Sequence, residues 1–307
     1  MGGICFSTER FRIIDGKKSA KLEKFSTPFS HVGRIYAVII IGNNQLVSGG
    51  EDQTIKVWSL SNFACLRTLT SHTGEVRVLI NLNETQFVSG STDRMVKLWD
   101  LTNMTCLRTL SGHNGTVFSI IKINEYQIAS GSDDKTIIVW ELKGGTAIKI
   151  LIGHTFGVHS IIKLNDLEIV SGSADCTIKI WDLVSSTCLK TLNEHIMMID
   201  KIIKIDENRI ASASQDRTIK IWDLNINKCI MTLTGHTAGI YAMLLINDTH
   251  IMTGSLDKTI KIFDITTGKC YKNVEHENDI NEIYSLVLFN NFQVLIASYE
   301  EIKIWTL

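Results

Sequence analysis

Short runs in which apolar and polar residues alternate follow one another along the chain, separated by turn-forming residues. In residues 177–181, Ile178 and Ile180 face one way and Lys179 faces the other, which is the two-residue period of a β-strand. The Gly, Asn and Asp residues between the runs favour tight turns. One stretch of the chain therefore predicts four consecutive short strands, at residues 106–110, 117–123, 128–132 and 136–140.

This set of four strands recurs about every 41 residues, with a histidine near the start of each copy and a large aromatic residue near its end. The histidines are His31, His72, His113, His154, His195, His236 and His276, and the aromatic residues are Trp58, Trp99, Trp140, Trp181, Trp222, Phe263 and Trp305. Seven copies fill 287 of the 307 positions and leave 20. We therefore expect a leader at residues 1–20, whose order the sequence leaves open, and one repeat domain at 21–307. Its copies span about 21–61, 62–102, 103–143, 144–184, 185–225, 226–266 and 267–307.

Two dipeptides recur at fixed places within the copies. Gly-His stands at 112–113, 153–154 and 235–236, and Trp-Asp stands at 99–100, 181–182 and 222–223. Four short strands per copy with these dipeptides resemble the WD-repeat β-propeller family. The resemblance implies an all-β fold, a seven-bladed β-propeller whose blades are four-stranded antiparallel sheets.

The register of the repeat also predicts how the propeller closes. The sequence stops just after Trp305, at the third strand of the seventh copy, so the fourth strand of that blade has to come from elsewhere. Residues 21–27 stand at the matching distance before His31. We expect this N-terminal segment to form the missing strand and so to remove an open sheet edge.

Most copies combine a serine or threonine, a histidine and an aspartate, as in Ser130, His113 and Asp134. The same residue types form the catalytic triad of many hydrolases. The resemblance implies a structural role instead, a buried hydrogen-bond network that includes the strand tryptophan and holds each blade together. The expected network residues are His72, Asp93, Trp99, His113, Asp134, Trp140, His154, Asp175, Trp181, His195, Asp216, Trp222, His236 and Asp257.

The seventh copy departs from this pattern. With Trp305 as the anchor, Ile296 falls at the serine position and Glu300 near the aspartate position, while a match at Ser298 keeps the serine but shortens the turn. A few residues are also inserted after His276. Sequence drift in a closing blade and reshaping of this blade for a ligand both account for the departure.

Function is expected on one face of the propeller, since the blades themselves are packed sheets. In the family this face presents the residues three and five positions after each histidine and the residue before each aspartate. Those positions hold four of the six tyrosines, and five acidic residues against two arginines. Aromatic rings among carboxylates suit a peptide with a basic or apolar anchor residue, although aromatic residues there also pack over their neighbours. The candidate peptide-binding residues are Tyr36, Arg77, Phe118, His159, Asp200, Tyr241, Tyr284 and Tyr299.

Two branches of the family bear on the partner. Segments such as residues 88–100 are similar to the propellers of F-box ubiquitin-ligase receptors, which read phosphorylated peptides with several arginines; here Arg34 and Arg77 alone match. Phe118 and Tyr284 resemble the aromatic pair with which the histone-tail-binding subunit of lysine methyltransferase complexes clamps an arginine. A ubiquitin-ligase substrate receptor, with its ligase link supplied in trans, is therefore the alternative to a general interaction scaffold.

Charge and composition narrow the classes of function. With 31 basic and 32 acidic side chains the net charge is −1, which does not favour direct binding to nucleic acid or an anionic membrane. No apolar run reaches the length of a signal-peptide core or a membrane span, so we expect an intracellular protein of the cytoplasm, the nucleus or both. The cysteines that share one repeat position are expected to be small, buried and free: Cys65, Cys106, Cys188, Cys229 and Cys270.

The sequence shows no phosphate-binding glycine loop and no Cys/His cluster, so we expect neither a cofactor nor a metal. Lys201 stands as a lone charge where the other copies mostly have Ala or Ser. We predict a non-catalytic scaffold or adaptor that binds peptide segments of other proteins, a single propeller working within a larger complex. A channel-sited enzyme is the further alternative.

Overall fold

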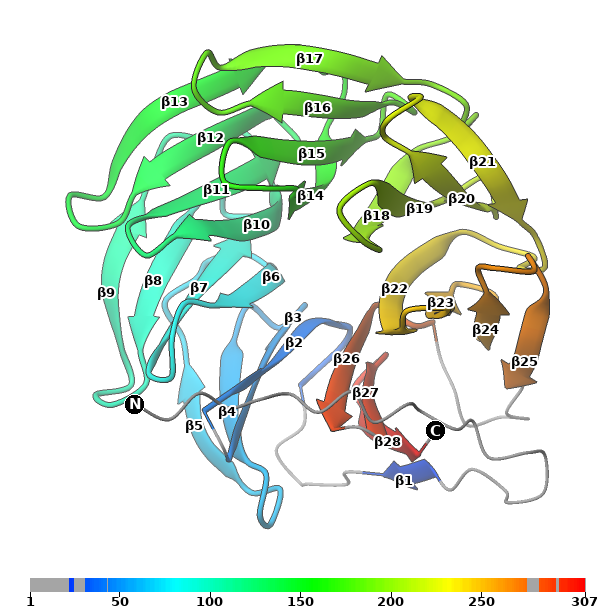
Figure 1. The fold of residues 1–307 in the computed structure, drawn as a ribbon. Helices are drawn as coiled ribbons and strands as arrows, with labels where there is room; N and C mark the ends of the chain where they lie inside the picture. The colour runs from blue at the N-terminus through cyan, green and yellow to red at the C-terminus, as the bar shows by residue number, and fades with distance from the viewer. Residues whose placement is uncertain (1–21, 25–30, 43, 275–281, 291–292, 307) are drawn as a thin grey trace, which may run out of the picture.

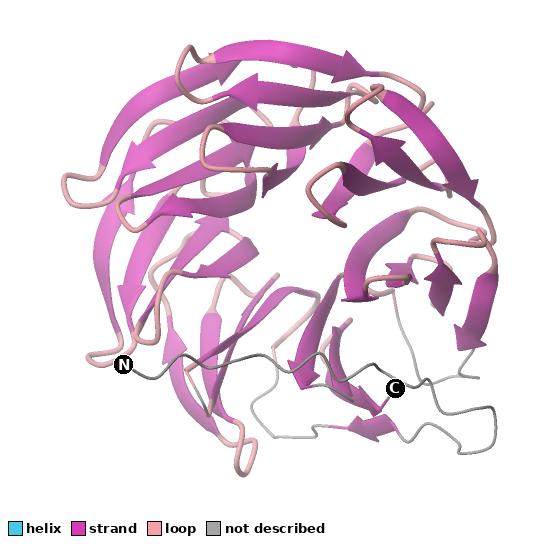
Figure 2. Ribbon diagram, in the orientation of Figure 1, coloured by secondary structure: helices cyan, strands magenta, loops and turns pink. Residues whose placement is uncertain are grey.

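The computed structural model describes residues 22–24, 31–42, 44–274, 282–290 and 293–306. Within these ranges the chain forms strands and turns, with no helix and hence no helix that would cross a membrane (Figure 2). The described strands form seven antiparallel sheets of four strands each, arranged as blades around a central channel (Figure 1). The predicted all-β, seven-bladed propeller is confirmed.

Each blade runs from a strand beside the channel to a strand on the outside. The innermost strands are β2 (Ile35–Ile41), β6 (Val76–Asn81), β10 (Val117–Asn124), β14 (Val158–Lys163), β18 (Ile199–Lys204), β22 (Ile240–Asn247) and β26 (Ser285–Asn290). The second strands are β3 (Gln45–Gly50), β7 (Gln86–Ser91), β11 (Gln127–Ser132), β15 (Glu168–Ser173), β19 (Arg209–Ser214), β23 (His250–Ser255) and β27 (Gln293–Ala297). The third strands are β4 (Ile55–Ser59), β8 (Val96–Asp100), β12 (Thr136–Glu141), β16 (Ile178–Asp182), β20 (Ile219–Asp223), β24 (Ile260–Asp264) and β28 (Ile302–Thr306). The outermost strands are β5 (Cys65–Leu69), β9 (Thr105–Leu110), β13 (Thr146–Ile152), β17 (Thr187–Leu192), β21 (Lys228–Leu233), β25 (Cys270–Val274) and β1 (Leu22–Lys24).

The hydrophobic core lies between neighbouring blades. In the layer between blades two and three, Val88 and Leu98 pack against Ile120, Ile128 and Trp140 of the next blade. Six further layers of this kind are described, including one between blades seven and one. Neighbouring blades pack against both faces of each blade. The second strands, such as β11, are therefore buried on both sides, which suits their apolar and small residues. Each fully buried large apolar side chain contributes roughly 1.5–3 kcal/mol to this packing.

The seventh blade draws one strand from the other end of the sequence. The backbone of β1 pairs antiparallel with β28, which places Leu22 opposite Trp305. The rest of the predicted segment 21–27, like the leader at 1–20 with Cys5, lies outside the described residues. Closure of the propeller by this strand therefore stays a prediction.

The outermost strands carry the repeated cysteines, and their burial differs from the prediction. The described cysteines are free, but Cys188 and Cys270 are exposed, and Cys65, Cys106 and Cys229 are half-buried. The prediction of buried cysteines was wrong because an outermost strand is covered by its neighbours on only part of its surface.

Candidate functional site

A β-bulge interrupts the innermost strand of blades one to six at the same place. In β2, Ile35 pairs with Gly50 and Ala37 pairs with Gly49, so Tyr36 is left without a partner in the ladder. Such an extra residue is turned away from the regular pleat, which re-aims its side chain. The residues at this position are Tyr36, Arg77, Phe118, His159, Asp200 and Tyr241.

In blade seven, Tyr284 lies beside the bulge residues of the other blades. Tyr284 directly precedes the first paired residue of β26, and its N–H donates a hydrogen bond of 3.1 Å to the carbonyl of Ala297. We call Tyr284 and the six bulge residues the mouth belt. Their sequence signal is a fixed distance of five residues after the histidine in blades one to six.

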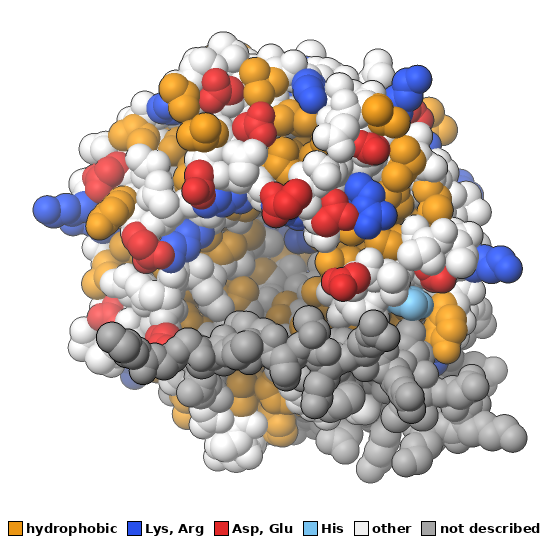
Figure 3. Space-filling model, viewed as in Figure 1, with side chains coloured by type: hydrophobic (Ala, Val, Ile, Leu, Met, Phe, Trp, Pro, Cys, Tyr) orange, Lys and Arg blue, Asp and Glu red, His pale blue; other side chains and the backbone are white. Residues whose placement is uncertain are grey.

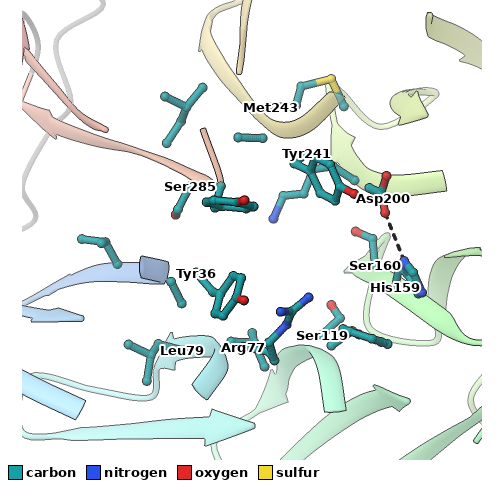
Figure 4. Close-up of a pocket in the computed structure, with 18 of the residues that line it drawn as sticks. Tyr36, Arg77, Leu79, Ser119, His159, Ser160, Asp200, Tyr241, Met243 and Ser285 are labelled. Atoms are coloured by element: carbon teal, nitrogen blue, oxygen red, sulfur yellow. Dashed lines mark hydrogen bonds and ion pairs between the residues drawn. The ribbon is translucent and has the colours of Figure 1, made fainter. Parts of the chain in front are cut away.

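The mouth belt lines a cavity of about 810 Å³ in the centre of the propeller. The space-filling view shows the hollow (Figure 3), and the close-up shows Tyr36, Arg77, Tyr241 and Asp200 facing it from different blades (Figure 4). The structure thus brings together seven of the eight residues that the sequence predicted as peptide-binding candidates. These residues are half-buried, although the side chain of Asp200 is only 5% exposed.

Neighbouring members of the mouth belt touch one another. The Arg77 guanidinium lies 3.9 Å from the centre of the Tyr36 ring and 5.4 Å from that of Phe118. Phe118 in turn lies 4.4 Å from the His159 ring, measured between centroids. Both contacts of Arg77 are of the cation–π type, which favours a fixed position of the guanidinium over the aromatic face.

Further contacts link His159 to Asp200 and three tyrosines to one another. His159 Nδ1 is 3.1 Å from Asp200 Oδ1, and the Gln215 side-chain amide donates a 2.6 Å hydrogen bond to the other oxygen of Asp200. Tyr241 and Tyr36 both pack against Tyr284, at centroid distances of 6.0 and 5.4 Å. The belt is therefore a connected set of side chains that holds its shape before a ligand arrives.

Tyr284 is also fixed by hydrogen bonds across the junction of blades one and seven. Arg34 Nε–H donates to its hydroxyl at 2.8 Å, and the hydroxyl donates to the Glu282 carboxylate. Burial raises the pKa of Tyr284, and burial likewise raises the pKa values of Tyr36 and Tyr241. All three hydroxyls are therefore uncharged donors near neutral pH.

Tyr299, the eighth candidate, lies outside the mouth belt, and its role in binding stays a prediction. It is 45% exposed, is not part of the cavity wall, and forms a backbone bridge with Arg34 of blade one. The physical reason is the turn that contains it. Ala297 pairs with Ile302, which leaves four residues in this turn, whereas the pairing of Gly131 with Ile137 leaves five in blade three. The turn that contains Tyr299 is therefore one residue shorter than its counterpart in blade three.

The histidines predicted for the blade network lie in a chain of hydrogen bonds. In blade three, Trp140 Nε1–H donates to Ser130 Oγ at 2.7 Å, and Ser130 Oγ is 2.8 Å from His113 Nε2. His113 Nδ1 is 2.7 Å from Asp134 Oδ2. Since the ionised carboxylate only accepts, His113 donates from Nδ1 and accepts the Ser130 hydroxyl at Nε2.

This arrangement has the connectivity of a hydrolase triad but no access for a substrate. Ser130 is fully buried, and its oxygen already accepts the tryptophan N–H. A nucleophile has to reach the reacting carbon, so the contacts of this serine are those of a structural group. Sequence reasoning did not include the first blade in this network, although His31, Asp52, Ser48 and Trp58 make the same contacts there.

The network carboxylates have lowered pKa values. Burial by itself would raise the pKa of Asp93, but hydrogen bonds from His72 and from the N–H groups of Met95 and Thr73 outweigh it and hold the pKa at about 2. The pKa values of the other five network aspartates are also lowered, by the same balance between burial and hydrogen bonds. They are Asp52, Asp134, Asp175, Asp216 and Asp257.

Comparison with known proteins agrees with this architecture. The family model described as WD domain, G-beta repeat matches residues 23–59, 63–100, 104–141, 145–182, 186–223 and 227–264. The chain therefore belongs to the WD-repeat family, whose propellers are typical of protein-interaction scaffolds. Each matched segment begins near the outermost strand of one blade and ends with the third strand of the next. A search of curated proteins finds no match.

Proposed function

We propose that the chain is a protein-interaction scaffold that binds a peptide segment of its partners at the mouth belt. The observation that carries this proposal is the bulge, which turns one side chain per blade toward the channel in blades one to six. Those side chains include three Tyr or Phe rings, with Tyr284 as a fourth. Aromatic residues around a pocket are typical of the energetic centres of protein interfaces.

An apolar anchor residue fits this mouth best. Arg77 already occupies the face of the Tyr36 ring, and Glu75 accepts a 3.0 Å hydrogen bond from the same guanidinium. A partner arginine would have to displace Arg77 from that ring face, whereas an apolar side chain only has to enter the cavity. A basic anchor, the other form predicted from the sequence, is an outcome that the experiment below distinguishes.

The ubiquitin-ligase alternative needs cations that are open to a phosphate group. Arg34 Nη1 lies 3.7 Å from Glu51 Oε1, and Arg34 Nε lies 3.8 Å from Glu282 Oε2. Arg77 is paired with Glu75. A phosphorylated segment would therefore compete with carboxylates that are already in place. No contact of the described residues favours this role over a general scaffold, and it stays a prediction.

The test compares two double variants. Phe118→Ala with Tyr284→Ala removes rings from both sides of the mouth, and Tyr126→Ala with Tyr271→Ala removes two exposed rings elsewhere. Partners captured from native extract and identified by mass spectrometry should be lost from the first variant and retained by the second. Because the mouth rings are half-buried, we expect the Tm of both variants to stay within about 3 °C of the unsubstituted protein, or about 1 kcal/mol.

Equal capture by both variants would contradict binding at the mouth. Synthetic peptides from any captured partner, with the anchor residue changed from Leu to Arg, then decide between the apolar and the basic anchor. A partner that is lost after phosphatase treatment would favour the ubiquitin-ligase role.

A further inference from the structure

One tier of residues lies directly behind the mouth belt in the same strands. Six of its seven members are small or apolar, and the seventh is Lys201. The tier consists of Ala37, Val78, Ser119, Ser160, Lys201, Ala242 and Ser285, all of which line the central cavity. Sequence reasoning treated Lys201 as a lone charge, but the fold places it in the wall of the channel.

Lys201 differs from the other cations of the cavity wall in its partners. Arg34 pairs with Glu51 and Glu282, and Arg77 pairs with Glu75. Among the residues that the structure describes, Lys201 has no hydrogen bond and no ion pair. The neighbouring carboxylate of Asp200 is already bound by His159 and Gln215.

The position of Lys201 makes its charge costly in the absence of an anion. Its side chain is open to the channel, yet the blades surround the channel, and the resulting loss of bulk water lowers the pKa of Lys201. An anion beside it favours the charged form and reverses this effect. The site therefore gains most from a negatively charged group that enters the channel.

We propose that the Lys201 ammonium binds a carboxylate that the captured peptide segment inserts behind the mouth belt. This proposal rests on the proposed function, because it names the chemistry of the segment that the mouth receives. A single ammonium matches a single negative charge, whereas a phosphate dianion would remain partly unpaired.

Two hydroxyls of the same tier support a carboxylate. Ser119 Oγ accepts a 2.9 Å hydrogen bond from the N–H of Ile161, and Ser160 Oγ accepts one of 3.0 Å from the N–H of Ile202. With each oxygen accepting from a backbone N–H, each O–H remains available as a donor. The ligand is thus an acidic side chain or a free C-terminal carboxylate that follows an apolar anchor.

The first experiment tests the anion site without a peptide. Propionate is titrated into the full chain with isotope-labelled lysine, and the Lys201 side-chain NMR signal is assigned with Lys201→Ala. We expect a saturable shift of this signal and a rise in the measured pKa of Lys201 as propionate binds. Lys220, on a third strand and hydrogen-bonded to Thr232, is the control and should not shift. A Lys201 signal that moves no more than that of Lys220 overturns the proposal.

The second experiment tests the segment. An array of synthetic peptides, each with one fixed residue among randomised positions and with either a free or an amidated C-terminus, is bound to the purified full chain. We expect Asp or Glu to be enriched beside the apolar anchor if a side chain supplies the carboxylate, and only free C-termini to bind if the terminus does.

Two substitutions test whether the acidic preference of the selected peptides depends on Lys201. Lys201→Met should weaken the best acidic peptides about tenfold, as for one charged hydrogen bond, while keeping the apolar preference. Lys201→Glu should replace the acidic preference by Lys or Arg, and equal melting temperatures check that both variants fold. An acidic preference that persists in Lys201→Glu overturns the proposal.

The two experiments separate this proposal from the proposed function. If no peptide is selected and the Phe118→Ala/Tyr284→Ala variant behaves like the unsubstituted chain, peptide binding at the mouth fails, and the propionate titration still decides whether Lys201 is an anion site. If apolar peptides are selected without any acidic preference, the mouth binds peptides and the Lys201 proposal fails.

Discussion

In blade three, Ser130 joins Trp140 to His113, whereas in blade seven Ile296 takes the place of the serine. Trp305 Nε1–H has consequently no hydrogen-bond partner among the described residues, although it is fully buried. Blade seven also has the shorter turn described above. His276, which would complete a network there, lies outside the described residues.

The turns of blades three and seven make different backbone contacts. In blade three, the N–H of Asp133 donates to the carbonyl of Thr116 in the same blade, at 2.8 Å. In blade seven, the N–H of Glu300 donates to the carbonyl of Gly33 at 2.8 Å, and Ser298 accepts from the N–H of Ile35 at 3.0 Å. The turn is therefore bonded to blade one.

These contacts form a backbone junction at the place where the propeller closes. The comparison teaches that blade three has a complete side-chain network of its own, whereas blade seven lacks the serine of that network and has backbone hydrogen bonds from its turn to blade one. Glu300, which the sequence placed near the network aspartate, instead has φ of +60°. That conformation belongs to the residue after the aspartate in other blades, such as Lys135 with φ of +74°. Drift and ligand-driven reshaping were the explanations that the sequence suggested for this blade, and both stay predictions.

The largest effect is expected from removing the N-terminal strand that is predicted to complete blade seven. Deletion of residues 1–24 removes three residue pairs between β1 and β28. Such pairs carry about two to four ladder hydrogen bonds, each worth about 1 kcal/mol net, so we expect a loss on the order of 2–4 kcal/mol. The freed edge of β28 should also cause association at high concentration. Urea unfolding and size-exclusion chromatography measure the two effects.

Deletion of residues 1–20 is the matched control, because it keeps β1. If both deletions unfold at the same urea concentration as the full chain, the N-terminal strand does not close the propeller, and the junction between the 298–300 turn and blade one is sufficient.

A smaller effect is expected from the network of one blade. Asp134→Ala removes the acceptor of His113 and of the N–H and hydroxyl of Thr136, which leaves buried donors unpaired and should cost about 2 kcal/mol at neutral pH. Glu300→Ala, at the nearest position in blade seven, should change the free energy of unfolding by less than about 0.5 kcal/mol. Equal effects would contradict the difference between the blades.

The pH dependence of the same pair follows from the lowered pKa of Asp134. Although burial alone would raise that pKa, the hydrogen bonds, beginning with that from His113, bring it below the ordinary value of about 3.9. A lowered pKa in the folded state stabilises the protein above about pH 4, and this contribution is lost as the pH falls toward the folded-state pKa. The stability gap between Asp134→Ala and the unsubstituted chain should therefore narrow below pH 4. A constant gap down to pH 2 would show that the carboxylate charge is not what the network uses.

The smallest effect concerns the unpaired N–H of Trp305. Ile296→Thr and Ile296→Val remove the same volume, but the threonine hydroxyl supplies an acceptor at the place of Ser130 in blade three. We expect the threonine variant to be more stable than the valine variant by about 1 kcal/mol, which is the net value of one hydrogen bond. Ordinarily a buried valine is the more stable of the two. A more stable valine variant would mean that the hydroxyl does not reach Trp305 Nε1.

The sequence by itself determined the repeat and nearly everything that follows from its period. Seven copies, four strands in each and the His–Ser–Trp–Asp pattern were all readable, because each copy folds into the same local environment. Even the members of the mouth belt were readable, since a bulge at a fixed place turns one numbered position per copy toward the channel.

Only the tertiary structure decided what happens where the copies stop being equivalent. It showed that the turn after Ala297 is one residue shorter than its counterpart in blade three, and that Tyr299 in this turn forms a backbone bridge with Arg34 of blade one. It also turned Lys201 from an isolated charge into part of a channel wall, and it showed which carboxylates are already paired with the two arginines. The Arg34–Tyr299 bridge joins segments that lie far apart in the sequence, and a repeat pattern carries no information about which segments meet in the folded propeller.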